Sequence, residues 1–211
     1  MRRPKTPNMS RKAELIDARP DLGRNRRGAL RVGEGMTRFI RTASAALVLA
    51  ALAVTTASAE LKEGAKAPLF TTRAALAGKE FGFSLKAALA KGPVVLYFYP
   101  KAFTQGCTLE ANAFAEAMPQ FKAAKATVIG MSADDIATLK DFSRKECRDA
   151  FPVGVSSPQI GKAYDVAMAS GMTRRTSYVI ARDGRIVAVH SNADYRDHVA
   201  KTLAAVRRLS K

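Results

Sequence analysis

The chain of 211 residues contains only two cysteines, and one of them, Cys107, closes the stretch "VVLYFYPKAFTQGC". The apolar run at its start predicts a buried strand, and helical spacing begins near the cysteine. Cys107 then lies in the first turn of a helix, just past the carboxyl end of a strand, where the reaction sites of open α/β sheets concentrate. Free N–H groups and the helix dipole there lower a thiol pKa from about 8.5 towards neutrality. The position therefore fits either a reactive thiolate or a small buried apolar side chain.

Three neighbours of Cys107 have properties that suit a reaction site. Pro100 ends the predicted strand and turns the chain, Thr104 brings a hydroxyl within one turn of the sulfur, and Gly106 permits close backbone approach. Each of these residues is common in loops that join a strand to a helix. The spacing alone therefore does not decide between the two interpretations of Cys107.

The elements that must position these residues alternate along the chain. Strands are expected at 94–99, 127–132, 176–181 and 185–191, the last two joined by a turn at Asp183-Gly184. Helices are expected at about 107–122, 134–147, 158–165 and 194–209. The stretch 151–166 reads as a short extended piece and a helix inserted before the hairpin. This order predicts an α/β protein with a mixed sheet, helices on both faces and a thioredoxin-like fold.

Four stretches of the chain resemble one known family. Pro100, Thr104 and Cys107 form the pattern P-x-x-x-T-x-x-C, and "VVLYFYPKAFTQGCTLEA" resembles the active-site segment of the peroxiredoxins, specifically the bacterioferritin comigratory protein group. The stretches "VIGMSADDIATLKDF", "GKAYDV" and "RRTSYVIARDGRIV" are similar to later segments of that group and follow in the same order. The resemblance covers most of the chain after residue 60 and implies a peroxiredoxin-type elaboration of the fold.

The resemblance implies a role for each of five residues. Cys107 would be the peroxidatic cysteine, Thr104 would hydrogen-bond the peroxide, and Pro100 would shield the thiolate from water. Arg175 would stabilise the thiolate and the departing oxygen, and Glu110 would orient this arginine. The alternatives are a surface arginine and an ordinary glutamate on a helix surface.

The implied reaction is the reduction of hydrogen peroxide or alkyl hydroperoxides through a cysteine sulfenic acid. It requires no metal and no organic cofactor. The two histidines, His190 and His198, lie far along the chain without a ligand-spaced partner. They are expected to be solvent-facing or structural.

The second cysteine leaves the regeneration step open. Many members of the group carry a resolving cysteine five residues after the first, where this chain has Asn112. Cys147 lies at the end of the next predicted helix, about a turn beyond the expected place near Ser143. It is a possible resolving cysteine, the alternatives being a one-Cys enzyme and an inert residue. In either case, thioredoxin or a thioredoxin-like dithiol is the expected reductant.

Two other function classes fit the sequence less well. A periplasmic thioredoxin-like disulfide oxidoreductase or a copper-delivery protein needs a second cysteine three or four residues after the first, where Glu110 and Ala111 stand. The net charge of +17 would also suit a basic module that binds anionic surfaces or nucleic acid. Because this charge is scattered and no binding motif accompanies it, we expect no nucleic acid partner.

The first 59 residues predict an exported protein. Arg38 and Arg41 precede an apolar run that ends near "ASA" at 57–59, the pattern of a signal peptide over 36–59. Translation is then expected to start at Met36, and residues 1–35 form a non-native or disordered basic extension. The domain is expected at 60–211, periplasmic or secreted, as a monomer or weak dimer without stable membrane insertion after signal cleavage. The alternatives are an uncleaved anchor and a buried amphipathic helix.

Overall fold

The computed structural model describes residues 61–210. The basic extension expected over 1–35 and the signal peptide expected over 36–59 lie outside the described residues. Within 61–210, the helices are all too short or too polar to span a bilayer.

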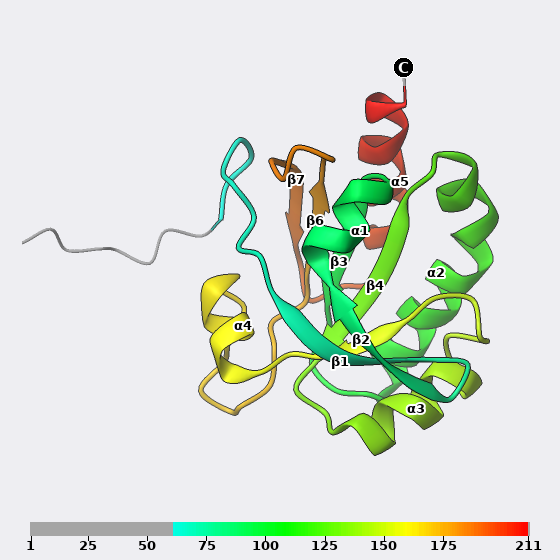
Figure 1. Ribbon diagram of the computed structural model, residues 1–211. Helices are drawn as coiled ribbons and strands as arrows, with labels where there is room; N and C mark the ends of the chain where they lie inside the picture. The colour runs from blue at the N-terminus through cyan, green and yellow to red at the C-terminus, as the bar shows by residue number, and fades with distance from the viewer. Residues whose placement is uncertain (1–60, 211) are drawn as a thin grey trace, which may run out of the picture. The chain divides into compact units, whose positions relative to one another are not determined.

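A mixed sheet of seven strands forms the centre of the described domain (Figure 1). Its strands lie in the order β2-β1-β5-β4-β3-β6-β7. Their bounds are β1 Thr71–Leu76, β2 Lys79–Ser84, β3 Val94–Phe98, β4 Thr127–Ser132, β5 Val153–Val155, β6 Thr176–Ile180 and β7 Ile186–Ser191. Strands β3, β4 and β5 are parallel to one another, whereas β6 and β1 run antiparallel to their neighbours.

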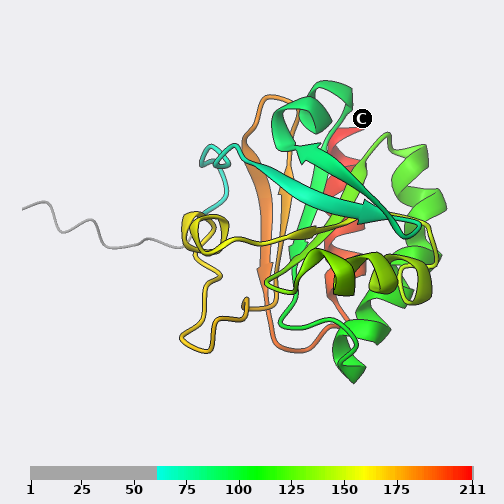
Figure 2. The ribbon, with the colours of Figure 1, turned by 60° about the horizontal axis from the view of Figure 1, so that its bottom comes forward.

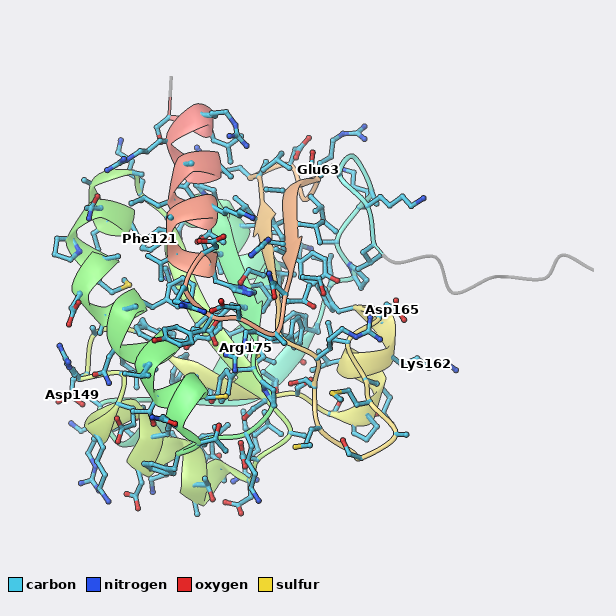
Figure 3. All side chains as sticks on the ribbon, turned by 180° about the vertical axis from the view of Figure 1, so that it is seen from behind. Glu63, Phe121, Asp149, Lys162, Asp165 and Arg175 are labelled. Carbon is cyan, nitrogen blue, oxygen red and sulfur yellow. The ribbon has the colours of Figure 1, made fainter. Side chains whose placement is uncertain are left out.

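Five helices cover the two faces of the sheet. They are α1 Leu85–Lys91, α2 Gln105–Ala123, α3 Ile136–Lys145, α4 Pro158–Ala163 and α5 His198–Leu209. Alternate residues of β3 face opposite ways, as the pleat of a strand requires. Tyr97 and Tyr99 pack into a core with α2, α3 and α5, whereas Leu96 and Phe98 pack with α1 and α4. Figure 2 shows α4 and α2 on opposite sides of the sheet. Figure 3, seen from behind, shows α2 and α5 together in front of it.

The predicted mixed sheet with helices on both faces is confirmed, and the arrangement is thioredoxin-like. The four predicted strands and four predicted helices are present, most with ends shifted by one or two residues. Helix α5 starts at His198 rather than at 194. The predicted span 134–147 placed Cys147 inside a helix. Helix α3 instead ends at Lys145, so Cys147 follows it.

The sequence reading omitted β1, β2 and α1. Most β2 residues are exposed, so the strand carries no clear apolar alternation that could identify it. The extended piece predicted before the hairpin is β5, which is not peripheral, because it lies inside the sheet between β1 and β4. Its three residues are too few for a periodic signal.

The register of β3 against β6 determines which residues meet at one edge of the sheet. Phe98, the last residue of β3, pairs with Thr176, the first of β6. Arg175 precedes Thr176, and the loop to α2 follows Phe98, so the antiparallel pairing brings the two segments together. Thr173 reinforces this junction, because its hydroxyl donates a hydrogen bond to the carbonyl of Tyr99 (2.6 Å).

The substitution Gly130→Ala should destabilise the fold. A Cβ at Gly130 would lie 2.7 Å from Cζ of Tyr97, whose ring is buried and stacked on Phe114 with centroids 4.3 Å apart. Because this ring has no room to move, we expect a loss of about 1–3 kcal/mol in the free energy of unfolding, measured by urea denaturation. Gly82→Ala is the matched control, since its Cβ meets nothing within 4 Å. Equal stability of the two variants would contradict this packing.

Candidate active site

Cys107 lies in the first turn of α2, close to where the helix begins. Thr104 is the N-cap residue, and its carbonyl accepts the first helical hydrogen bond, from the N–H of Thr108 (2.9 Å). The thiol is free and only 2% exposed. The predicted position of Cys107 is therefore confirmed: it lies in the first turn of a helix, where N–H groups have no partner within the helix.

Arg175 contacts the sulfur directly. Its Nη2 donates to Sγ of Cys107 at 3.4 Å, and its Nε donates to the carbonyl of Ala193 at 3.0 Å. The side chain is buried, which excludes the surface arginine that the sequence left open. Figure 3 shows it beside the first turn of α2. The guanidinium packs close to the backbone of Gly106, where a Cβ would lie 3.4 Å from Nη2, an ordinary contact distance.

Glu110 holds the other side of the guanidinium. Its Oε2 accepts a hydrogen bond from Nη1 of Arg175, and its side chain is fully buried. It is therefore not an ordinary glutamate on a helix surface. Burial raises the pKa of this carboxyl to about 8, although the charge and the hydrogen bond of Arg175 act in the opposite direction. Its second oxygen, Oε1, is buried without a hydrogen-bond partner.

His198 is the site residue that the sequence reading missed. Its side chain is completely buried, with Nδ1 at 3.7 Å from Oε1 of Glu110, so a solvent-facing position is wrong. His190 lies beside it, with ring centroids 4.4 Å apart, although no pattern in the sequence indicated that the two histidines meet. One signal was present: His198, Thr202 and Val206 recur at the spacing of one buried helix face.

The loop between β3 and α2 is held in place by a hydrogen bond to a residue just after the end of β4. The carboxylate of Asp134 accepts hydrogen bonds from the N–H of Ala102 and from the hydroxyl of Ser132, both at 2.8 Å. Within the loop, Phe103 has a φ of 61°, a left-handed conformation that is rare for a bulky side chain. Such strain persists only where the surroundings enforce it, often at functional sites.

Pro100 and Thr104 lie in this same loop. Pro100 is half-buried and follows β3 by two residues, whereas Thr104 is exposed. The hydroxyl of Thr104 donates to the carbonyl of Lys101 (3.0 Å) and does not cap α2. Its lone pairs are therefore available to a donor such as a peroxide hydroxyl.

Cys147 is a free, fully buried thiol in the same apolar core as Cys107. Burial raises its pKa well above the ordinary value for a thiol. Ser143, the position where the resemblance expected a resolving residue, accepts a hydrogen bond from the N–H of Gly78 in the β1–β2 turn (2.9 Å). Among residues 61–210, no group of three or more metal-ligating side chains comes together.

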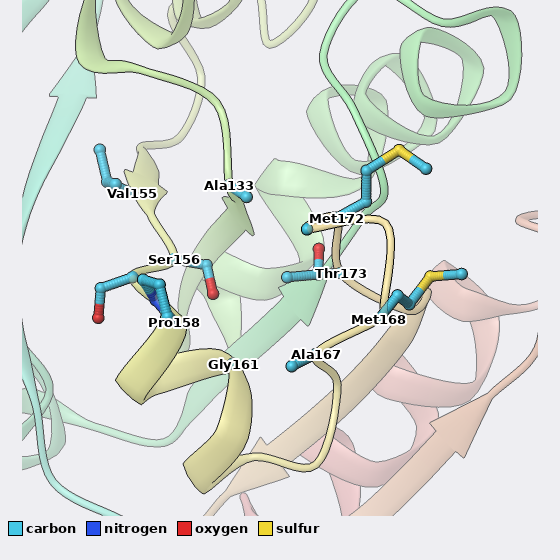
Figure 4. Close-up of a pocket in the computed structure, with 11 residues that line it drawn as sticks. Ala133, Val155, Ser156, Pro158, Gly161, Ala167, Met168, Met172 and Thr173 are labelled. Atoms are coloured by element: carbon cyan, nitrogen blue, oxygen red, sulfur yellow. The ribbon is translucent and has the colours of Figure 1, made fainter.

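A pocket of about 440 Å³ opens at the carboxyl ends of β4 and β5 (Figure 4). Its walls are mostly apolar, and they include Pro158, Met168 and Met172. Thr173 also lines it, two residues before Arg175 and hydrogen-bonded to Tyr99. The pocket therefore adjoins the loop that leads to Cys107.

Comparisons with known proteins agree with this geometry. Residues 64–189 match the AhpC/TSA family. The chain is similar to a chloroplastic peroxiredoxin Q of Oryza sativa (31% identity, covering 71% of this chain and 69% of the relative) and to that of Suaeda salsa (32%, covering 72% and 70%).

Two solved structures are similar over the same part of the chain. Peroxidoxin BcpB of Mycobacterium tuberculosis has a TM-score of 0.64 at 27% identity, covering 71% of this chain and 98% of that one. Peroxiredoxin Q of Xanthomonas campestris has a TM-score of 0.58 at 28% identity, covering 66% and 91%. The chain belongs to the AhpC/TSA family and, within it, to the peroxiredoxins of the bacterioferritin comigratory protein group.

Proposed function

We propose that the protein is a thiol-dependent peroxidase in which Cys107 is the peroxidatic nucleophile. The observation that carries this proposal is the contact between Nη2 of Arg175 and Sγ of Cys107. A buried cation held against a thiol at a helix start favours the thiolate, which is the nucleophilic form. Family membership supports the same activity, and it does not favour a disulfide oxidoreductase or a basic binding module.

The reaction forms one bond and breaks one. The Cys107 thiolate attacks one oxygen of the peroxide, an S–O bond forms, and the O–O bond breaks. The second oxygen takes up a proton from solvent and leaves as water or an alcohol. Sulfur is oxidised to the sulfenic acid while the peroxide is reduced, so the step needs no further electron carrier.

Each neighbour of Cys107 has a part in this step. Arg175 stabilises the negative charge that moves from sulfur to the departing oxygen, and its orientation is fixed in advance by Glu110 and the Ala193 carbonyl. The hydroxyl of Thr104 accepts a hydrogen bond from the peroxide. Half-buried Pro100 limits the access of water to the sulfur.

Organic hydroperoxides are proposed substrates beside hydrogen peroxide. The apolar pocket of Figure 4 offers a surface for an alkyl chain, and it lies at the edge of the sheet from which the loop to Cys107 departs. A solved structure of the Xanthomonas campestris bacterioferritin comigratory protein, 28% identical to this chain, is described in terms of alkyl peroxide reduction activity. That similarity supports the same substrate class here.

We assign resolution of the sulfenic acid to Cys147. As folded, its thiol is buried and its raised pKa keeps it protonated, so it cannot attack. Disulfide formation needs Cα atoms roughly 4.4–6.8 Å apart and an exposed thiolate, which requires local unfolding. Arg148 and Asp149, directly after Cys147, have φ values of 51° and 58°, so unwinding this segment would release strain.

The resulting disulfide would be reduced by thioredoxin or a thioredoxin-like dithiol. The sequence over 36–59 supports export, and an exported enzyme depends on a reductant supplied outside the cytoplasm.

Intact mass after one equivalent of hydrogen peroxide tests both cysteine roles. The wild type should lose two hydrogens as a Cys107–Cys147 disulfide forms. Cys147→Ser should gain one oxygen on Cys107, and Cys107→Ser should react slowly or not at all. A stable oxygen adduct in the wild type would make this a one-Cys enzyme, and fast oxidation of Cys107→Ser would contradict the peroxidase assignment.

Arg175→Lys tests the electrostatic role of the arginine. Lysine keeps the charge but lacks the planar fork that contacts Cys107 and Glu110 together. We expect the rate constant for peroxide to fall by about 10²–10³-fold, as for other lost transition-state donors. Arg174→Lys is the matched control, since Arg174 is adjacent and exposed. Equal rates for the two variants would exclude the proposed role.

A further inference from the structure

The buried oxygen Oε1 of Glu110 needs an explanation beyond the proposed mechanism. Oε2 of the carboxyl accepts a hydrogen bond from Arg175, but Oε1 is buried without a hydrogen-bond partner. A buried carboxylate oxygen without a donor is costly, because it loses its hydration and gains nothing in return. The ionisable group that faces this oxygen is His198, through Nδ1 at 3.7 Å.

The hydrogen bonds of His198 determine where its own proton lies. Nε2 lies 3.0 Å from the carbonyl oxygen of Asn192, which can only accept, so Nε2 carries a hydrogen. Nδ1 lies 2.7 Å from the hydroxyl of Ser177, which can donate to it. The imidazole is therefore satisfied in its neutral form, with the lone pair of Nδ1 accepting from Ser177 and no N–H available to Glu110.

An ionised Glu110 would leave a charged oxygen buried beside a ring nitrogen that has no hydrogen to give it. A proton on the carboxyl removes this uncompensated charge, and the hydrogen bonds of His198 leave Nδ1 without a proton of its own. We propose that Glu110 is a neutral carboxylic acid in the reduced enzyme and that His198 is a positioning residue that keeps it so, leaving the charge of Arg175 to the Cys107 thiolate.

The charges of the cluster favour this assignment. Arg175 is one cation in contact with two groups that can each become an anion, Cys107 and Glu110. With both ionised, the buried cluster would carry a net negative charge. With Glu110 neutral, thiolate and guanidinium balance, while the carbonyl oxygen of the acid still accepts from Nη1 and holds the arginine in place.

The groups around the cluster agree with a neutral His198. Arg175, His190 on β7 and Lys201 on α5 all lower its pKa, and together with burial they bring it to about 4. The raised pKa of Glu110, about 8, likewise keeps the proton on the carboxyl at neutral pH. Two further groups interact electrostatically with the pair: Tyr97, on β3, with Glu110, and Asp194, in the loop before α5, with His198.

The pH dependence follows from these directions. Glu110 loses its proton as pH rises through about 8, and its carboxylate then competes with the thiolate for Arg175. The rate constant for peroxide should therefore fall above that pH. This inference rests on the proposed function, but its central test below requires no turnover.

Infrared spectroscopy of the reduced protein tests the protonation of Glu110. We expect the carbonyl stretching band of a buried carboxylic acid at neutral pH, lost above about pH 8. The band should be missing in Glu110→Gln and kept in Glu116→Gln, a matched control on the exposed side of α2. In Glu110→Gln the alkaline decline of the peroxide rate should also disappear. A wild type without the band at neutral pH would overturn the proposal, whatever its peroxidase activity.

A second variant tests the role of His198. In His198→Asn, the amide can accept from Ser177 and donate an N–H to Oε1, which stabilises the carboxylate. The midpoint at which the acid band disappears should fall by about one pH unit or more. His190→Asn is the matched control, because the ring of His190 lies 4.4 Å from that of His198, and within residues 61–210 no ion pair or hydrogen bond joins His190 to Glu110. An unchanged midpoint in a folded His198→Asn would show that His198 does not position the proton.

Discussion

The placement of one buried guanidinium governs the site. Arg175 contacts the sulfur of Cys107, a carboxyl oxygen of Glu110 and the carbonyl of Ala193, which come from two different parts of the chain. Burying a cation is costly unless its donors are paired, so these contacts must be nearly complete before the arginine can lie there. The β3–β6 register, the start of α2 and the loop before α5 are all constrained by this one side chain.

The sequence predicted the parts of the site that depend on local pattern. A buried strand followed by a helix start determines the setting of Cys107, and the family resemblance pointed to Arg175 and Glu110, which lie together beside its sulfur. His198 could not be predicted in the same way, because its contact with Glu110 depends on how α5 packs against α2. Strands β1 and β2 could not be predicted, because their exposed residues lack the alternation that a half-buried strand shows.

The two cysteines place opposite demands on the same core. Cys107 needs a rigid surrounding, since preorganised donors act on the transition state only when they do not have to move. Cys147 is buried in that core and would have to leave it to act. If Cys147 acts as proposed, the strained residues after it and the end of α3 at Lys145 form the part that must unwind, while the β3–β6 junction and the start of α2 stay rigid.

In the proposed mechanism the fold, and not the thiol itself, makes Cys107 reactive. This can be tested with the second-order rate constant for hydrogen peroxide with the reduced Cys147→Ser protein, measured in the native state and in urea at the same pH. The native thiol should react at least about 10²–10³-fold faster, the scale of preorganised electrostatic stabilisation. Equal rate constants in the two states would contradict it.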